Sequence, residues 1–189
     1  MIFRRIHGRI VPINQESKPK AIAKGVGGIA AGIGVAGAAG HVAARMTEHA
    51  IVQDKISKFA RKVADKVAPK VGEQLDLFKV HNIGAAKNFY ESAHYHQVRA
   101  QTTLKAIKYL RRGGEVAGGA LIAAGTNKIL NQTRYKDRPG ARAAISTGAG
   151  VAAAFAVEQM YQNSMGRKTF SSAAKAGMGD ILKKIVRRL

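Results

Sequence analysis

The sequence predicts an all-α protein, and three observations lead to this fold class. Segments of Gly, Ala and small apolar residues recur at residues 25–44, 116–127 and 143–157. Apolar residues between these segments are spaced by three and four, which is the period of an amphipathic helix. Aromatic residues are only 6% of the chain and Trp is absent, so the side chains suit thin helix-on-helix packing.

The charge balance narrows the classes of partner. The 189 residues include 32 Lys and Arg but 11 Asp and Glu, which gives a formal net charge of +21. Such an excess implies a polyanionic partner, either nucleic acid or the anionic face of a bacterial membrane. There is no Cys, which excludes disulfides, thiolate metal sites and cysteine nucleophiles.

Residues 1–24 are expected to form a basic N-terminal arm and linker. Two β-prone runs flank the turn dipeptide His7-Gly8, and Pro12 ends the second of them. This pattern fits a small β-hairpin, but an isolated hairpin is marginal in water, so we favour an extended arm that orders on a partner. The candidate contacts to DNA or another anionic surface are Arg4, Arg5, Arg9, Lys18, Lys20 and Lys24.

Residues 25–44 form the first small-residue segment, a run of twenty residues without a formal charge. This length spans a bilayer as a helix, but its five Val and Ile side chains supply only about −2 kcal/mol of insertion free energy. A secretory signal fits poorly because the basic region before the run is long. Small residues recur every fourth position, which predicts close helix packing or oligomerisation through Gly28, Gly32, Ala36 and Gly40.

Two amphipathic helices are expected in the middle of the chain. The first covers about residues 47–68, supported by Asp54–Lys58 and Arg61–Asp65 ion pairs, with an apolar face of Val52, Ile56, Phe59, Val63 and Val67. Residues 71–83 are expected to turn the chain. The second covers about residues 85–112 and is expected to stop at Gly113-Gly114, with one side formed by Ala86, Phe89, Ala93, Ala100, Leu104 and Ile107.

The remaining small-residue segments complete a helical region over residues 25–170. Segment 116–127 has twelve uncharged residues and segment 143–157 has fifteen, so both are expected to be too short to span a bilayer. The third segment repeats the four-residue stripe, which predicts packing or oligomerisation through Ala144, Gly148, Ala152 and Ala156.

Residues 171–189 are expected to form a basic amphipathic C-terminal helix that begins after Asp180. Its apolar and basic faces would dock on a membrane surface or a partner helix through Ile181, Leu182, Lys183, Lys184, Ile185, Val186, Arg187, Arg188 and Leu189.

Motifs for catalysis and cofactor binding are weak. The run from Gly32 to Gly37 matches the dinucleotide fingerprint G-x-G-x-x-G, with Asp54 near the ribose-binding distance, but no β-strand pattern precedes it. His94 and His96 point about 200° apart on a helix and cannot share a metal ion. With no nucleophile elbow, P-loop or paired acids, we expect no catalytic residues, no cofactor and no metal, and therefore no enzyme.

The opening FRRIHGRIVPI, followed by a Lys-rich linker and a Gly/Ala run, resembles the start of small proteins of tailed bacteriophages. The layout of the whole chain is similar to internal virion and DNA-ejection proteins. The resemblance implies a non-enzymatic virion protein that leaves with the genome and lines or perforates the host cell envelope. Together with the net charge and the small-residue stripes, it leads us to expect four partners: copies of the chain, other virion proteins, double-stranded DNA without sequence preference and the anionic bacterial membrane.

Two alternatives remain open. A structural capsid- or tail-associated protein would bury the same helices against protein and use its basic ends to bind nucleic acid, without membrane insertion. A secreted pore-forming toxin would require a cleaved leader and toxicity from outside the cell.

Overall fold

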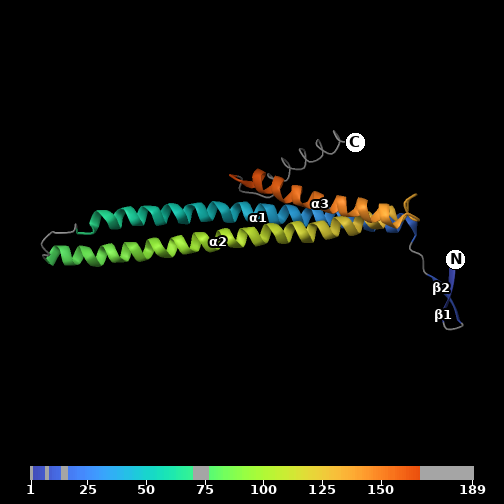
Figure 1. Cartoon of the computed structure of the whole chain (residues 1–189), viewed down its shortest axis with the longest axis horizontal. Helices are drawn as coiled ribbons and strands as arrows, with labels where there is room; N and C mark the ends of the chain where they lie inside the picture. Colours follow the sequence, from blue (N-terminus) through green and yellow to red (C-terminus); the bar gives the residue numbers. More distant parts are fainter. Residues whose placement is uncertain (1, 7–8, 14–16, 70–76, 167–189) are drawn as a thin grey trace. The chain divides into compact units, whose positions relative to one another are not determined.

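The computed structural model describes residues 2–6, 9–13, 17–69 and 77–166. These residues form strands β1 (Ile2–Ile6) and β2 (Arg9–Ile13) and helices α1 (Lys18–Val67), α2 (Leu77–Leu130) and α3 (Pro139–Ser164) (Figure 1). Long helices account for nearly all of the described chain, so the predicted all-α fold class is confirmed.

The N-terminal strands pair antiparallel, with Ile2 opposite Ile13 and Ile6 opposite Arg9. Two strands of five residues offer few ladder hydrogen bonds, and the described residues form no second sheet against which they could pack. The choice between a hairpin that forms alone and an arm that orders on a partner stays a prediction.

Helix α1 is longer than the sequence patterns predicted. It begins at Lys18, where the amide of Ala21 donates to the carbonyl of Ser17 at 3.0 Å, so the expected linker is already helical there. Pro19 is tolerated because the first turn of a helix has free amide groups. The helix then continues without a break through the small-residue segment and the amphipathic segment to Val67.

Helix α2 also overruns its predicted ends. It starts at Leu77 inside the expected turn region, and it passes through Gly113-Gly114, where a stop was predicted. The stop prediction was wrong because helix packing can outweigh the cost of each interior Gly, which is about 1 kcal/mol. The basic segment after α2 forms a short turn region that ends where Pro139 starts α3.

The chain divides into two compact units, and each is described by itself. Unit 1 contains Met1–Ala38 and Gly114–Glu158, and unit 2 contains Ala39–Gly113 and Gln159–Leu189. Unit 1 therefore holds all three small-residue segments except the last part of the first. Unit 2 holds both amphipathic segments completely.

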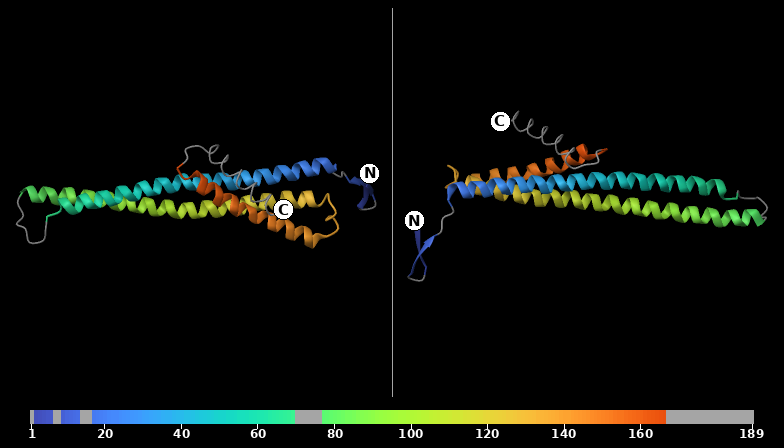
Figure 2. Two further views of the ribbon diagram at one scale, coloured as in Figure 1. Left: turned by 90° about the horizontal axis from the view of Figure 1, so that it is seen from above. Right: turned by 180° about the vertical axis from the view of Figure 1, so that it is seen from behind.

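In unit 1, parts of α1, α2 and α3 run side by side (Figures 1 and 2). Gly25 of α1 approaches Ile129 of α2, whereas Gly32 approaches Gly118, so these two helices are antiparallel. Helix α3 returns along α2 after the turn at residues 131–138, and its Gly150 approaches Gly119. The three segments thus form a small bundle whose contacts are made largely by glycine.

In unit 2, α1 and α2 form an antiparallel pair with a seven-residue repeat of small buried residues. The repeat on α1 is Ala43, Ala50, Ser57 and Ala64, and the repeat on α2 is Ala86, Ala93, Ala100 and Ile107. A seven-residue repeat keeps one seam facing the partner in a left-handed coiled coil. The Oγ atom of Ser57 donates to the carbonyl oxygen of Ala93 at 2.7 Å, which joins the two repeats.

The apolar face predicted for residues 47–68 was wrong at three of its five positions, while Val63 and Val67 are half-buried. Val52, Ile56 and Phe59 are exposed, by 51%, 38% and 68%, while Gln53, Ser57 and Ala60 are buried. The same reversal affects α2, where Phe89 and Leu104 are exposed although the other predicted core positions are buried. Small side chains occupy the seam because they let the two helix backbones approach closely.

Candidate functional site

Unit 1 buries its small side chains and exposes its large apolar ones. Its buried apolar residues are Ala21, Ala36, Ile122, Ala153, Ala156 and Val157, of which four are Ala. Its exposed apolar residues, which we call the outer apolar face of unit 1, are Ile22, Val26, Ile33, Val35, Val116, Leu121, Ile145, Val151 and Phe155. Water-soluble helical bundles usually bury such large apolar side chains. The inverse arrangement is typical of helices that pack through small residues and present branched side chains to lipid.

The helices of unit 1 are close enough that several positions admit only glycine. A Cβ atom on Gly32 would lie 2.6 Å from the carbonyl oxygen of Gly118 and 2.6 Å from a side-chain carbon of Ile122. A Cβ atom on Gly119 would lie 2.9 Å from the carbonyl oxygen of Gly150, and a Cβ atom on Gly150 would meet the same clash. The backbone of α2 is therefore in direct contact with the backbone of α1 and with that of α3.

The first predicted small-residue stripe packs within the chain. Gly28 lies against Gly125, and both Gly32 and Ala36 face α2 near Gly118. The fourth member, Gly40, is buried in unit 2. This stripe is therefore occupied by α2 in the single chain.

The second predicted stripe is placed differently. Of its members, only Ala156 is buried, while Ala144, Gly148 and Ala152 are exposed, and a Cβ on Gly148 would meet nothing within 4 Å. Within the chain, Ala156 is therefore the member of this stripe that packs. Helix α3 turns the neighbouring face inward, formed by Ser146, Gly150, Ala153 and Val157. A role of the exposed stripe in oligomerisation stays a prediction.

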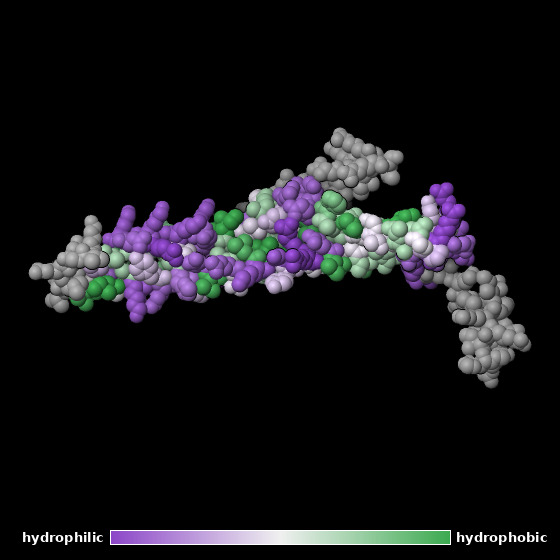
Figure 3. All heavy atoms as spheres, in the orientation of Figure 1, coloured by the Kyte–Doolittle hydropathy of each residue, from purple (hydrophilic) through white to green (hydrophobic). Residues whose placement is uncertain are grey.

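Hydrophilic residues gather at one end of unit 1, where α1 starts and the turn between α2 and α3 lies (Figure 3), and eight basic residues lie in or next to these segments. Arg142 donates from Nη1 to Asn131 Oδ1 and, at 3.3 Å, to the carbonyl of Lys136, which fixes the turn. Asp137 is the one acid in the turn. The set, which we call the basic end of unit 1, is Lys18, Lys20, Lys24, Lys128, Arg134, Lys136, Arg138 and Arg142.

Two described helices are long and apolar enough to cross a membrane by length and composition, α1 and α3. Core helices of soluble proteins pass the same test, so this finding alone assigns no membrane. The uncharged third segment keeps its fifteen residues, whereas α3 as a whole has 26. At 1.5 Å per residue this is about 39 Å.

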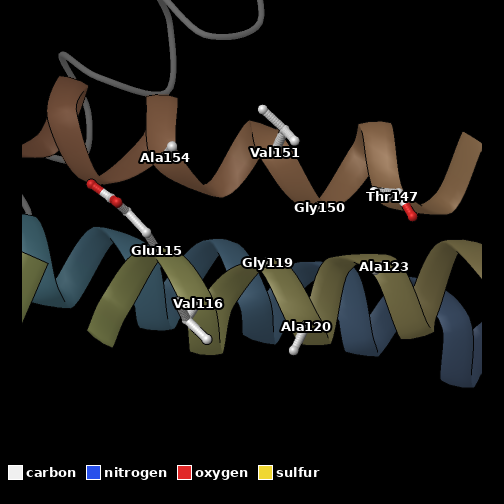
Figure 4. Close-up of a pocket in the computed structure, with 9 residues that line it drawn as sticks. All are labelled: Glu115, Val116, Gly119, Ala120, Ala123, Thr147, Gly150, Val151 and Ala154. Atoms are coloured by element: carbon white, nitrogen blue, oxygen red, sulfur yellow. The ribbon is translucent and has the colours of Figure 1, made fainter. Parts of the chain in front are cut away.

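A shallow groove of about 400 Å³ is lined by residues of α2 and α3 in unit 1. Gly119 of α2 and Gly150 of α3, which lie opposite each other, are among its lining residues (Figure 4). The only charged group among its lining residues is the carboxylate of Glu115. Such a surface offers apolar contact but no converging polar groups that would orient a small-molecule substrate.

A polar cluster in unit 2 joins the last turn of α3 to α1. The Nδ1 atom of His41 lies 2.9 Å from Ser164 Oγ, and the hydroxyl groups of Thr47 and Tyr161 lie 3.0 Å apart. The amide of Gly166, which has a φ of 74°, donates to Glu48 Oε1 at 2.6 Å. Ser164 is fully buried, so its hydroxyl cannot reach a substrate as a nucleophile would. The cluster caps the helix end.

Sequence reasoning missed a buried polar layer in unit 2. Gln53 is buried, and its Oε1 accepts a hydrogen bond from His96 Nδ1 at 2.5 Å. Its Nε2 faces His49 Nε2 at 3.4 Å. A polar residue amid a run of Ala at seam positions was the available signal, because such residues often set the register of a coiled coil.

The motifs set aside in the sequence have ordinary structural roles. The G-x-G-x-x-G match starts fourteen residues into α1, so it lacks the strand–turn–helix context of a dinucleotide site. His96 is engaged by Gln53, and no group of three potential metal ligands occurs in the part of the chain that the structure describes.

The predicted contacts at the two ends of the chain are only partly described. Arg4 and Arg5 lie on β1 and Arg9 on β2, while Lys18, Lys20 and Lys24 are exposed on the first turns of α1. The predicted C-terminal helix at residues 171–189, with Ile181 to Leu189, lies outside the described residues.

Comparison of the chain with protein-family models, curated proteins and solved structures gives no match.

Proposed function

We propose that this chain is a non-enzymatic virion protein of a tailed bacteriophage that contacts lipid through unit 1 and assists genome passage across the host envelope. The observation that supports the lipid contact is the inverse packing of unit 1, with Gly and Ala inside and branched or aromatic side chains outside. The phage setting is supported by the N-terminal motif and the layout of the chain.

The inverse packing makes the free energy of inserting unit 1 into a membrane more favourable. Glycines are poor lipid-facing residues, and in unit 1 the closest of them face other helices. The nine residues of the outer apolar face would supply about −0.3 to −0.6 kcal/mol each, or about −3 to −5 kcal/mol together. The basic end adds attraction to anionic headgroups. These are the two signals that stable membrane association needs.

Flotation with anionic vesicles tests the lipid contact. The full chain is mixed with phosphatidylglycerol-containing vesicles at 0.15 M salt, and the bound fraction and dye leakage are measured. We expect Phe155→Asp in unit 1 to lower binding by about tenfold or more, because it would place a charge in lipid.

Phe59→Asp is the matched control. Phe59 is 68% exposed and Phe155 is 69% exposed, so the two substitutions differ mainly in the unit that carries them. Circular dichroism checks that both variants keep their helices. Equal loss of vesicle binding in the two variants, or no binding by the unaltered chain, would contradict the lipid contact.

A second candidate function is a structural capsid- or tail-associated protein whose basic residues neutralise nucleic acid. One observation favours it: the uncharged run of α2 lies between Glu115 and Lys128. That run covers about 20 Å, whereas the hydrocarbon core is about 30 Å thick. This candidate predicts solubility without detergent, no flotation and DNA binding with a steep salt dependence.

A further inference from the structure

The part of α2 that lies in unit 2 contains a long basic stretch without acids. Between Glu91 and Glu115 there is no Asp or Glu, whereas the stretch holds Arg99, Lys105, Lys108, Arg111 and Arg112. Arg111 packs its guanidinium over the ring of Tyr161 at 4.6 Å. The other four cations belong to residues that are exposed.

These cations lie on the side of α2 that points away from α1. The inward positions repeat every seven residues at Ala93, Ala100 and Ile107. On the opposite face of α2, residues spaced alternately by three and four form a line, and every residue of this line is exposed. We call it the outer stripe of α2, and it consists of Tyr95, Val98, Thr102, Lys105, Tyr109 and Arg112.

Arg99 and Lys108 flank the outer stripe on either side. Tyr95 is 58% exposed and Tyr109 is 73% exposed, so both rings and hydroxyl groups are open to a partner. Arg99 Nη1 lies 3.4 Å from the hydroxyl oxygen of Tyr95. The stripe therefore combines cations with hydroxyl donors over about 25 Å of helix.

No acid in the part of the chain that the structure describes pairs with the lysines of this surface or with Arg112. Lys105, Lys108 and Arg112 make no ion pair with any described residue, whereas elsewhere in the unit Lys58 pairs with Asp54 at 2.7 Å. The carboxylate of Asp65 accepts a hydrogen bond from Tyr90 instead of closing the predicted pair with Arg61. The positive potential thus remains directed to solvent.

We propose that the outer stripe of α2 is a docking surface for the phosphate backbone of double-stranded DNA. An α-helix fits the major groove, and Lys105 and Arg112, seven residues apart, present cations about 10 Å apart along it. Contacts to phosphates need no base-reading groups, so the binding is independent of sequence. The proposal extends the nucleic-acid side of the proposed function and does not depend on the lipid contact of unit 1.

The arrangement of the stripe favours DNA over a membrane surface. A helix that lies on lipid has apolar residues along the centre of its contact face and cations at the edges. On the outer stripe the central positions include Lys105 and Arg112, which would be pushed toward hydrocarbon. Cations at the centre of the contact face suit DNA, whose phosphate charges lie on the surface that the helix would contact.

The test compares two triple variants of the full chain. The stripe variant carries Lys105→Gln, Lys108→Gln and Arg112→Gln. The control variant carries Lys55→Gln, Lys62→Gln and Lys66→Gln, which remove the same charge from outward positions of α1. Asp54 and Asp65 lie near those lysines in the sequence, so the control surface contains acids whereas the outer stripe does not. Binding to a 20-base-pair duplex is measured by fluorescence anisotropy from 0.05 to 0.2 M salt.

We expect the stripe variant to bind at least about tenfold more weakly at 0.1 M salt and to lower the salt slope by about 2.7, or 0.9 per lost contact. The control variant should lose less than about threefold. The N-terminal arm and the C-terminal residues are the same in both variants, so their contribution cancels. Equal losses in the two variants, or unchanged binding in the stripe variant, would overturn the proposal.

Vesicle flotation of the same variants separates this proposal from the lipid contact. If the stripe variant loses binding to anionic vesicles but keeps its affinity for DNA, the surface binds lipid and the DNA proposal is overturned. If DNA binding falls while flotation of the stripe variant stays unchanged, the DNA proposal is supported. Failure of the unaltered chain to float would contradict only the lipid contact of unit 1.

Discussion

Gly32 and Gly118 face each other so closely that neither can carry a side chain. A Cβ on Gly32 would lie 2.6 Å from the carbonyl oxygen of Gly118, and a Cβ on Gly118 would lie 2.8 Å from the carbonyl oxygen of Gly32. The reciprocal contact holds α1 and α2 together in unit 1. It explains why a glycine-rich sequence can form long helices although Gly is a poor helix former.

This contact predicts opposite effects for two glycine substitutions on the same helix. Gly118→Ala should destabilise the protein by about 1 to 3 kcal/mol, because the helices must separate to admit the methyl group. Gly113→Ala should stabilise it by about 0.5 to 1 kcal/mol, because a Cβ there meets nothing within 4 Å and Ala favours helix. Chemical denaturation followed by circular dichroism measures both. The same sign for the two substitutions would be incompatible with the packing described.

The buried layer of Gln53 and His96 predicts energetic coupling. The carboxamide oxygen of Gln53 accepts from His96 Nδ1 at 2.5 Å, so loss of either partner leaves a polar group at the seam without its hydrogen bond. We expect Gln53→Ala to cost about 1 to 3 kcal/mol of unfolding free energy.

A double-mutant cycle with His96→Ala isolates that hydrogen bond. The two losses should be less than additive, with a coupling energy of about 0.5 to 1.5 kcal/mol. Ser57→Ala, one turn along α1, serves as a comparison. The hydroxyl of Ser57 donates to the main-chain carbonyl of Ala93, and a carbonyl inside a helix keeps its helical hydrogen bond when the serine is replaced. Strict additivity of Gln53→Ala and His96→Ala would show that the layer contributes no interaction.

The sequence predicts the helical class well and the helix faces poorly, for a physical reason visible on α1. Large apolar residues such as Val52 and Phe59 recur at helical spacing and dominate any hydropathy pattern, yet they are exposed. The buried seam is made by Ala43, Ala50 and Ala64, whose small transfer energies hide it. A search for small residues every seven positions would have found the seam.

The candidate surfaces were predictable to different degrees. The small-residue stripe that includes Gly32 follows from its four-residue spacing alone. The outer stripe of α2 does not, because its cations are spread over residues 99–112 and only the position of the seam shows that they share one face. Whether an apolar residue such as Phe155 faces protein or lipid depends on neighbouring helices, which the local sequence does not encode.

The hydrogen bond between Tyr90 and Asp65 predicts a loss of stability at high pH. The hydroxyl of Tyr90 donates to Asp65 Oδ1 at 2.6 Å, and this bond to the carboxylate raises the pKa of Tyr90 above its usual 10. The folded state therefore holds the Tyr90 proton more tightly than the unfolded state does. The contribution is fully present below about pH 10 and is lost as the pH rises through the folded pKa.

Absorbance at 295 nm between pH 9 and 12 measures this titration. We expect Tyr90→Phe to remove a component that titrates above the ordinary tyrosine range and to flatten the fall of stability in that window. Tyr109→Phe is the control, since Tyr109 is 73% exposed and no described group accepts a hydrogen bond from it. If Tyr90→Phe and Tyr109→Phe give the same titration curves, the hydrogen bond to Asp65 has no effect on the proton.

The exposed stripe of α3 predicts self-association. Ala144, Gly148 and Ala152 leave a flat strip on the surface of unit 1, where a second copy could bring its helix close. Gly148→Leu should weaken association by about tenfold or more, because a branched side chain keeps the backbones apart.

Gly34→Leu is the matched control: a Cβ at Gly34 also meets nothing within 4 Å, but Gly34 lies on neither small-residue stripe. Sedimentation equilibrium in mild detergent distinguishes the two. Equal association constants for the two variants would exclude this strip of α3 as the contact between copies.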